Sequence, residues 1–469
     1  MTRPAVLGLD LGTSGIKAVL VGADGTVLAR ADRGYGLASP RPGWAETDPA
    51  QWEAAARDAV AAVVSAADAE VVAIGLDGQM HGTVLVDPAG EPVRPAVLWP
   101  DGRAAGELSA WEGLSPDRRR ALANPVVPGM TGPVLAWLAR HEPEAVARAG
   151  RLLLPKDWLR SRLVPGSFVT DPSDASATLL WDLEHDGWSE AVLAATAIPR
   201  RLLPEVVPSD SVVGHVPADV ATSWGVPAGV PVVAGCADAA ATLVGSDAAP
   251  GRLVVTVGSG AQVVLPGIEP RFDVPLSHHT YRAADGGAYA MLAVMNAGIA
   301  LSRVVDLLGG TWEDLYREYD RTRSIPGFVP FLSGERLPTA APAGSGQWFG
   351  LGLETQRADL FASALEGLCF TIRRGVESIP PVSDPIIDVA GGGTRSPVFV
   401  QLLADVLGRR LRRIDLEDAT GVGAALLGFD AAGVSRPEAS ARTGEVVEPS
   451  EAGPLEQRYA RFAAEVSRD

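Results

Sequence analysis

The most constraining feature of this chain is its beginning, where two apolar runs flank a short glycine-rich turn. Residues 6–11 and 16–20 are largely apolar, Asp10 lies near the end of the first run, and Gly12-Thr13-Ser14-Gly15 forms the turn. This pattern predicts a β-hairpin with a polar tip. Backbone N–H groups, two hydroxyls and a nearby lysine suit a phosphate held with Mg²⁺ beside the carboxylate. An ordinary hairpin with a solvated aspartate explains the turn equally well.

The opening pattern recurs in the middle of the chain. Residues 253–265 again form two apolar runs, with Gly258-Ser259-Gly260 as the turn between them. The polar segment 246–251, which contains proline and glycine, comes just before this second copy. We therefore predict a boundary there, with a first domain over 1–246 and a second over 247–469. Two copies, each opening one half, predict a duplicated α/β domain with a cleft between the halves.

Strands and helices alternate around the two hairpins. The first helix has Asp48 as a capping residue and Pro49 in its first turn. The residues after Val434 are polar, and we expect them to contribute little to the fold. The periodicity of apolar residues predicts helices over 47–67 and 356–379 and one that starts at 239, and strands over 71–76, 230–234 and 386–390.

Three of these strands end in polar, glycine-containing loops, where α/β proteins place their sites. The loops are Asp77-Gly78-Gln79-Met80-His81-Gly82, Gly235-Cys236-Ala237-Asp238 and Gly391-Gly392-Gly393-Thr394-Arg395-Ser396. A structural interpretation stands beside each functional one. Asp238 could simply cap a helix, His81 could be a satisfied polar group, and the three glycines could form a plain tight turn. Met80 and Trp99 could be core residues, and Lys17 a solvated lysine.

Composition narrows the class of protein. The chain has 469 residues, of which 47% are hydrophobic and 21% charged, which allows two or three well-packed domains. The net charge of −17 argues against nucleic acid or an anionic membrane as a partner. Cys236 and Cys369 offer neither a disulfide framework nor metal-ligand spacing. Neither a leader-like segment nor an apolar run of about 18 residues occurs, so we expect a cytoplasmic location.

Segments spread from residue 5 to about residue 430 resemble the FGGY family of carbohydrate kinases, in the actin–hexokinase–Hsp70 superfamily. Within the family, the loop Gly78-Gln79-Met80-His81-Gly82 is most similar to the sugar-contact loop of the xylulokinase branch. The segment 346–366 resembles the C-terminal signature of the family. The other similar segments are 8–14, the first phosphate loop; 98–103; 331–336; 391–397, the adenosine loop; and 421–425, a late connecting helix.

The resemblance implies a fold of two ribonuclease H-like domains around a central cleft, and an ATP- and Mg²⁺-dependent phosphorylation of a sugar hydroxyl. Asp238 would be the catalytic base and would contact the sugar, and Asp10 would lie on the metal side. The first domain would also carry the sugar site and the first phosphate loop, and the second domain the opposing loop and the adenosine site. The residues implied are Gly12, Thr13, Ser14, Lys17, Gly258 and Ser259 for the phosphates, Gly392, Gly393 and Ser396 for the adenosine, and Gln79, Met80, His81 and Trp99 for the sugar.

The sequence departs from the xylulokinase pattern at several positions. Ala239 follows Asp238 where an asparagine is usual, Asp77 replaces a small residue, Pro100 replaces an asparagine, and Val134 replaces a lysine. D-xylulose is the expected substrate, and another ketose, such as ribulose, or a polyol is the alternative. Asp77 could accept a hydrogen bond from the sugar or pair with Arg103. A chaperone, a filament protein or a silent sugar sensor of the same superfamily is the contrasting class, and related kinases suggest a homodimer.

Overall fold

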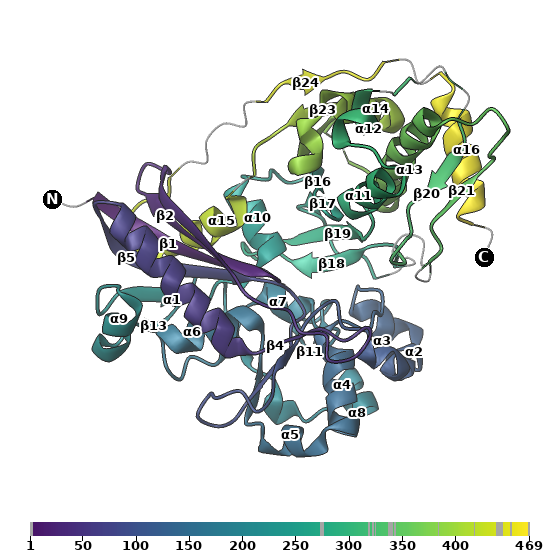
Figure 1. Cartoon of the computed structure of the whole chain (residues 1–469). Helices are drawn as coiled ribbons and strands as arrows, with labels where there is room; N and C mark the ends of the chain where they lie inside the picture. The colour runs from purple at the N-terminus through teal and green to yellow at the C-terminus, as the bar shows by residue number, and fades with distance from the viewer. Residues whose placement is uncertain are drawn as a thin grey trace.

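In the computed structural model, the amino-terminal hairpin is the centre of a seven-stranded mixed sheet (Figure 1). β1 (Arg3–Leu11) pairs antiparallel with β2 (Gly15–Gly22), and β2 with β3 (Val27–Gly34). On its other side β1 pairs parallel with β5 (Ala69–Gly78). β14 (Pro231–Val233) and β15 (Cys236–Ala237) pair with β5, and β13 (Val212–His215) pairs with β14. The structure describes residues 3–272, 276–317, 319–320, 323, 325–335, 341, 344–382, 384–416, 418–437, 444–450 and 453–467.

A second seven-stranded sheet repeats the pairing scheme of the first. Its first strand has an antiparallel hairpin on one side and parallel strands on the other, which is the same arrangement that β1 has. The predicted duplication is therefore confirmed. The strands are, in sheet order, β18 (His279–Arg282), β19 (Ala288–Val294), β17 (Ala261–Pro266), β16 (Val254–Val257), β22 (Ile386–Ala390), β23 (Arg410–Arg413) and β24 (Val446–Val447).

The predicted helices form, and polar side chains cap their first turns. The Asp48 carboxylate accepts a hydrogen bond from the N–H of Ala50 at the start of α1 (Pro49–Ala66). Gln356 caps α13 (Arg357–Ser378), and Asp359 closes a capping box with it. The hydroxyl of Ser396 accepts from the N–H of Phe399 and starts α14 (Pro397–Leu407). Side-chain caps of this kind satisfy N–H groups that have no partner within the helix.

Short elements connect these units. In the first half they are β4 (Glu46–Thr47), β6 (Val84–Val86), β7 (Ala96–Val97), η1 (Arg103–Glu107), α2 (Ser109–Glu112), α3 (Pro116–Ala121), α4 (Thr131–His141), α5 (Pro143–Arg148), β8 (Arg151–Leu153), α6 (Pro155–Leu163), β9 (Val169–Thr170), α7 (Pro172–Ser176), β10 (Trp181–Asp182), β11 (Gly187–Trp188), α8 (Glu190–Thr196), η2 (Arg200–Leu202), β12 (Glu205–Val206), α9 (Ala218–Trp224) and α10 (Asp238–Gly245). In the second half they are α11 (Gly298–Leu307), α12 (Trp312–Arg317), β20 (Gly327–Val329), β21 (Gln347–Phe349), η3 (Gly392–Arg395), α15 (Ala419–Gly428), η4 (Asp430–Ala432) and α16 (Leu455–Glu465).

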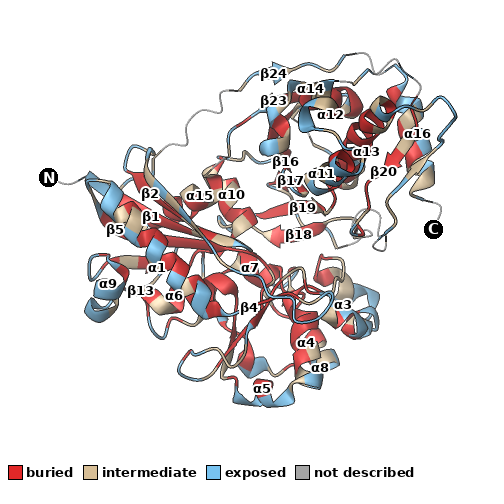
Figure 2. Cartoon of the chain, in the orientation of Figure 1, coloured by how far each residue is buried: buried red, intermediate tan, exposed pale blue. Residues whose placement is uncertain are grey.

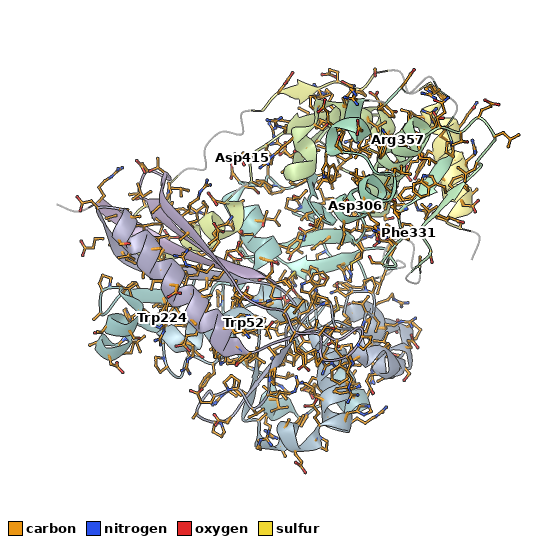
Figure 3. The ribbon with its side chains drawn as sticks, viewed as in Figure 1. Trp52, Trp224, Asp306, Phe331, Arg357 and Asp415 are labelled. Carbon is orange, nitrogen blue, oxygen red and sulfur yellow. The ribbon has the colours of Figure 1, made fainter. Side chains whose placement is uncertain are left out.

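Each half has an apolar core beside its sheet. In the first half, Trp52 of α1 and Trp158 of α6 meet edge to face, with ring centroids 6.1 Å apart. Trp224 at the end of α9 belongs to the same buried cluster, and Figure 3 shows both Trp52 and Trp224 in this half. In the second half α13 is the central helix, and Figure 2 shows it buried along most of its length.

Helix α15 comes from the second half of the sequence but packs on the first sheet, against β1, β5 and α10 (Figure 1). Glycines make this close approach possible. A Cβ at Gly423 would lie 1.9 Å from the carbonyl oxygen of Ala241 in α10, and one at Gly75 would lie 1.9 Å from that of Ala424. The backbones therefore touch without intervening side chains, and α10 and α15 join the two halves of the molecule.

The carboxyl-terminal segment contributes more than the sequence analysis predicted. The prediction that the residues after Val434 add little is wrong. β24 extends the second sheet at the edge of β23, and α16 buries Leu455, Tyr459 and Phe462 in the second core. These three residues recur at helical spacing on one face, so a short amphipathic helix was hidden by the polar composition around them.

Candidate functional site

The register of the first sheet brings charged residues side by side near the ends of adjacent strands. Asp10 of β1 lies opposite Lys17 of β2 on one side and Asp77 of β5 on the other. Asp77 in turn lies opposite Cys236, two residues before Asp238. The sheet thus gathers three acids and one lysine from segments that are far apart in the sequence.

Asp10 is held between the two halves of the chain. Its Oδ2 accepts a hydrogen bond of 2.5 Å from the hydroxyl of Thr420 in α15. Burial raises the pKa of Asp10, although the bond from Thr420 and the charge of Lys17 oppose the increase. Lys17 itself reaches Asp418, with 3.2 Å between Nζ and Oδ1. The first phosphate loop is therefore tied to the start of α15.

Asp77 plays neither of the roles that the sequence analysis considered for it. It is completely buried and lines neither cavity described below, so it does not reach a ligand there. Arg103 does not pair with it, because its guanidinium bonds to Asp101 and Glu46 instead. Burial and the charges of Asp10 and Asp238 raise the pKa of Asp77 well above its usual value. This raised pKa favours the protonated form of Asp77 beside Asp10.

Asp238 is the first residue of α10, at the end of the short strand β15. Its Oδ1 accepts a hydrogen bond of 2.7 Å from the N–H of Ala239, so it also satisfies one N–H of the first helical turn. Burial, followed by the negative charge of Asp10, raises its pKa to about 7. An acid with this pKa is suited to accepting a proton near neutral pH.

A cavity of about 660 Å³ opens in front of Asp238. The first half contributes Thr13, Met80, His81 and Trp99, and the second half contributes the hairpin tip at Gly258 and Ser259. The indole N–H of Trp99 donates a 2.9 Å hydrogen bond to the hydroxyl of Thr13, which fixes the cavity wall to the first loop. These predicted residues from both halves therefore meet around one space.

His81 enters this cavity as a hydrogen-bond acceptor. Its Nδ1 lies 2.6 Å from the carbonyl oxygen of Ala177, which can only accept, so Nδ1 carries the proton. The neutral ring then has its lone pair on Nε2. Its φ of +68° is unusual for a residue other than glycine, and it turns the loop so that the ring lines the cavity.

Sequence analysis missed a second histidine in the cavity, which comes from the second half. The ring of His279 in β18 stacks on Tyr281 with centroids 5.5 Å apart, and both residues line the cavity. Its Nδ1 lies 3.1 Å from Oδ1 of the buried Asn124 in the first half, so it too donates from Nδ1. Asn124 also bonds to the N–H and the carbonyl of Thr280. No motif marks these residues, because they meet only through long-range packing.

A second cavity, of about 610 Å³, adjoins the first on the other side of the hairpin tip. Gly258 and Ser259 line both cavities, and Gly392 and Gly393 line the second as predicted for the adenosine side. Trp312 and Tyr316 of α12 form an aromatic wall that the sequence analysis did not single out. The two cavities share Gly258 and Ser259 as lining residues, so the hairpin tip lies at the border of two ligand-sized spaces.

Several predicted site residues lie outside the two cavities. The side-chain amide of Gln79 donates a 3.0 Å hydrogen bond to the carbonyl of Gly12, so it supports the first loop. Ser396 caps α14, and Lys17 faces Asp418. Ser14 is exposed at the hairpin tip. Arg336, from the loop 331–336 that resembles the family, lies outside the described residues.

The acids of the site fit a magnesium ion that is bound mainly by phosphate oxygens. Over the part of the chain that the structure describes, no group of three or more His, Cys, Asp or Glu side chains could hold a metal ion. Mg²⁺ does not require such a group, because it commonly takes one or two carboxylates together with phosphates and water. Asp10 lies next to the first loop but lines neither cavity, so its role toward Mg²⁺ stays a prediction.

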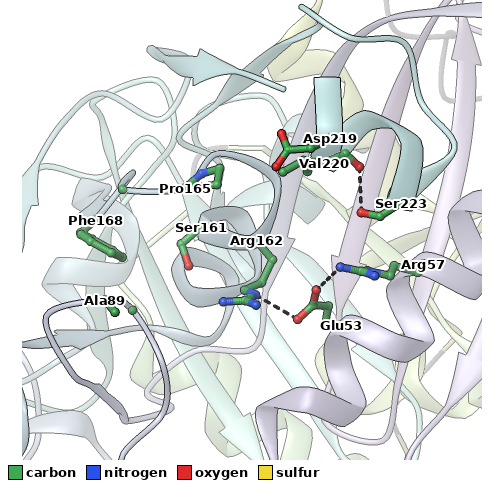
Figure 4. Close-up of a pocket in the computed structure, with 12 residues that line it drawn as sticks. Glu53, Arg57, Ala89, Ser161, Arg162, Pro165, Phe168, Asp219, Val220 and Ser223 are labelled. Carbon is green, nitrogen blue, oxygen red and sulfur yellow. Dashed lines mark hydrogen bonds and ion pairs between the residues drawn. The ribbon is translucent and has the colours of Figure 1, made fainter. Parts of the chain in front are cut away.

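A separate cavity of about 280 Å³ lies between α1, α6 and α9, and Figure 4 shows its lining. Three of its charged residues form ion pairs with one another. Glu53 pairs with Arg57 and with Arg162, and Arg162 also pairs with Glu91. Asp219 also lines this cavity, and we assign no chemistry to the space.

Comparisons with known proteins agree with the geometry. The FGGY carbohydrate kinase model for the N-terminal domain matches residues 5–245, and that for the C-terminal domain matches residues 253–432. The xylulose kinase of Escherichia coli K12 is 33% identical over 434 residues, covering 90% of this chain and 88% of that protein. None of the described helices has the length and apolar character that a membrane span needs.

Solved structures superpose over nearly the full chain. The crystal structure of a "xyloylose kinase" from Brucella ovis has a TM-score of 0.89 at 32% identity and covers 98% of both chains. That of xylulose kinase from Rhodospirillum rubrum has a TM-score of 0.88 at 28% identity, with the same coverage. The predicted fold of two similar domains of the actin and hexokinase type is thereby confirmed.

Proposed function

This chain belongs to the FGGY family of carbohydrate kinases, and on that basis we propose that it transfers the γ-phosphoryl group of ATP to D-xylulose, giving D-xylulose 5-phosphate. One observation carries the proposal. Asp238, an acid with a pKa of about 7, lines a cavity that shares the hairpin tip at Gly258 and Ser259 with a second cavity. A sugar in the first compartment and a nucleotide in the second would meet at this hairpin tip.

In the proposed mechanism the protein chiefly positions the reactants and takes up a proton. Asp238 accepts the proton of the attacking sugar hydroxyl as the new P–O bond forms. His81 accepts a hydrogen bond from another hydroxyl, and Trp99 covers an apolar face of the sugar. Thr13 and Ser259 bind phosphate oxygens from the two sides of the cleft. Asp10 would hold Mg²⁺, which offsets phosphate charge when bound.

The division at residues 246 and 247 remains our proposal for how the work is shared. The first domain would supply the base, the sugar site and one phosphate loop, and the second domain the other loop and the adenosine site. Water must be kept from the γ-phosphate, so we propose that the halves close on the substrates. We also propose that the protein lies in the cytoplasm and forms a homodimer. Light scattering of the purified protein would test the homodimer.

A panel of sugars in a coupled ADP assay tests the proposed reaction. We expect slow ATP hydrolysis without sugar, strong stimulation by D-xylulose, and the highest kcat/KM for that sugar among ketoses and polyols. Mass spectrometry of the product should show one added phosphate. An equal rate with and without every sugar would contradict the kinase proposal. A higher kcat/KM for ribulose or a polyol would favour the alternative substrate. We consider that alternative because Asp77, Pro100 and Ala239 depart from the xylulokinase pattern.

The rate should depend on pH through Asp238. Only the ionised carboxylate can accept the proton, and the ionised form predominates above its pKa of about 7. We therefore expect kcat/KM for the sugar to fall as the pH is lowered below about 7 and to level off above it. Measurements from pH 5.5 to 9, a range of about 1.5 to 2 units on each side of that pKa, would show both the decrease in kcat/KM at low pH and its plateau at high pH. A flat profile across the range would argue against Asp238 as the base.

His279 should contribute to binding the sugar but not the nucleotide. Replacing it with alanine removes a hydrogen-bonding group worth about 1 kcal/mol, so the KM for the sugar should increase by about 5- to 10-fold. The KM for ATP should stay nearly constant, because His279 lines only the first cavity. His185→Ala, at an exposed histidine, is the control. A His279→Ala enzyme with the KM values of the unmodified protein would contradict this role.

A further inference from the structure

A cluster of fully buried charges lies behind the loop that carries Asp238. Its centre is the ammonium of Lys156 in α6, which lies 2.7 Å from Oδ1 of Asp157, 3.0 Å from Oδ1 of Asp171 and 3.0 Å from Oδ2 of Asp174. Arg160, one helical turn further on, places Nη1 2.7 Å from the same Oδ1 of Asp157. None of these five side chains is more than 1% exposed.

Stability alone does not account for this cluster. Removing two cations and three acids from water costs free energy that their mutual attraction repays only in part, and apolar residues of similar size often serve stability as well or better. None of the five residues lines either cavity of the site, so they do not contact the substrates. Arg160 donates to the carbonyl of Val169 and also to the loop that leads to Asp238.

Hydrogen bonds connect the cluster to both ends of the segment 234–237. Arg160 donates from Nη1 to the carbonyl of Ala234, at 2.6 Å. At the other end, the hydroxyl of Ser173 in α7 accepts a 2.8 Å hydrogen bond from the N–H of Ala237, the residue before Asp238. The same hydroxyl donates to Oδ2 of Asp171 at 2.6 Å, so Asp171 fixes the direction in which it can accept.

Ser173 is thus the link between the buried charges and the acid of the site. The hydroxyl of Ser173 donates a hydrogen bond to Asp171. The same oxygen accepts one from the N–H of Ala237, where β15 ends and α10 begins. Loss of this contact would free the backbone at the point that sets where the carboxylate of Asp238 lies. Displacements of about 1 Å at a reacting group can cost about 100-fold in rate.

We propose that Ser173 is a positioning residue for Asp238, held in place by Asp171 and Lys156. This inference rests on the proposed kinase function, since it assigns Asp238 as the base. It is not a claim that Ser173 touches either substrate. The role requires the backbone at Ala237 to be fixed, and it predicts an effect on kcat rather than on the binding of sugar or ATP.

Ser209 offers a matched control. Its hydroxyl donates a 2.8 Å hydrogen bond to the same Oδ2 of Asp171, and both serines are buried. Ser173→Ala and Ser209→Ala each remove one hydroxyl that donates to Oδ2 of Asp171. Only Ser173→Ala also removes the acceptor of the N–H of Ala237. For Ser173→Ala we expect kcat to fall about 10- to 100-fold, with both KM values within about twofold. For Ser209→Ala we expect a similar change in Tm and a kcat within about twofold of the unmodified enzyme.

Equal kcat values for the two variants would overturn the proposal, and so would a loss in Ser173→Ala that appears only in KM. If Ser173→Ala does not fold, Ser173→Cys is measured instead, because it keeps the volume but bonds weakly, and the same loss confined to kcat is expected. If the unmodified protein phosphorylates no sugar, the proposed function fails. Crystal structures of the two alanine variants then decide the positioning role. An unmoved Asp238 in Ser173→Ala would refute it, and a displacement absent from Ser209→Ala would support it.

Discussion

Replacing Asp238 with asparagine is expected to lower kcat by about 10²- to 10⁴-fold, the range typical for loss of a general base. Asparagine keeps the shape of the side chain, and its amide oxygen can still accept from the N–H of Ala239, so the start of α10 should be retained. What is lost is the ability to take a proton from the sugar hydroxyl. A coupled ADP assay at saturating sugar and ATP measures kcat, and calorimetric titration measures ATP binding.

Binding of ATP should be nearly unchanged in Asp238→Asn, because Asp238 lines the first cavity but not the second. Removing a negative charge near Asp10 would, if anything, favour the anionic nucleotide. Asp219→Asn, at an exposed position in α9, serves as the matched control and should keep full activity. An Asp238→Asn protein that is folded and turns over at the rate of the unmodified enzyme would remove Asp238 from the mechanism.

The second large effect concerns stability. Gly423→Ala would place a Cβ 1.9 Å from the carbonyl oxygen of Ala241, so the backbones of α15 and α10 would have to separate. Overpacking of a rigid interior typically costs about 1–3 kcal/mol, and a clash between two backbones belongs at the upper end of this range. We expect the free energy of unfolding to decrease by about 3 kcal/mol. Urea denaturation followed by circular dichroism measures it.

Gly75→Ala is expected to act in the same way, because its Cβ would lie 1.9 Å from the carbonyl oxygen of Ala424 in the same helix. Gly106→Ala provides the control, because no atom lies within 4 Å of a Cβ there. If Gly423→Ala unfolded at the same urea concentration as Gly106→Ala, the close contact of α10 and α15 would not be what holds the halves together.

Local patterns accounted for much of this structure. The two hairpins, the capping residues Asp48 and Ser396, and the strand before Asp77 were predictable because each depends on neighbouring residues in the sequence. The position of Asp238 at the junction of a strand and a helix was predictable for the same reason. The family resemblance added the roles, which the patterns alone left open.

Long-range pairing was not predictable in this way. Asn124 meets Thr280, 156 positions later, only because β18 is the edge strand that faces the first half. The raised pKa of Asp77 depends on its burial and on two other acids that the sheet and β15 bring beside it. The tautomer of His81 depends on the carbonyl of Ala177, which no pattern near residue 81 reveals.

The placement of α15 has a consequence for biosynthesis. The helix that covers β1, β5 and α10 spans residues 419–428, so it leaves the ribosome only when the chain is nearly complete. At about 5–20 residues per second, the apolar surfaces that it covers stay open for about 10 to 40 seconds after residue 246 has been made. A fragment ending at that residue would keep those surfaces exposed permanently. The amino-terminal half is therefore expected to aggregate when expressed alone, and to become soluble when the remainder of the chain is produced with it.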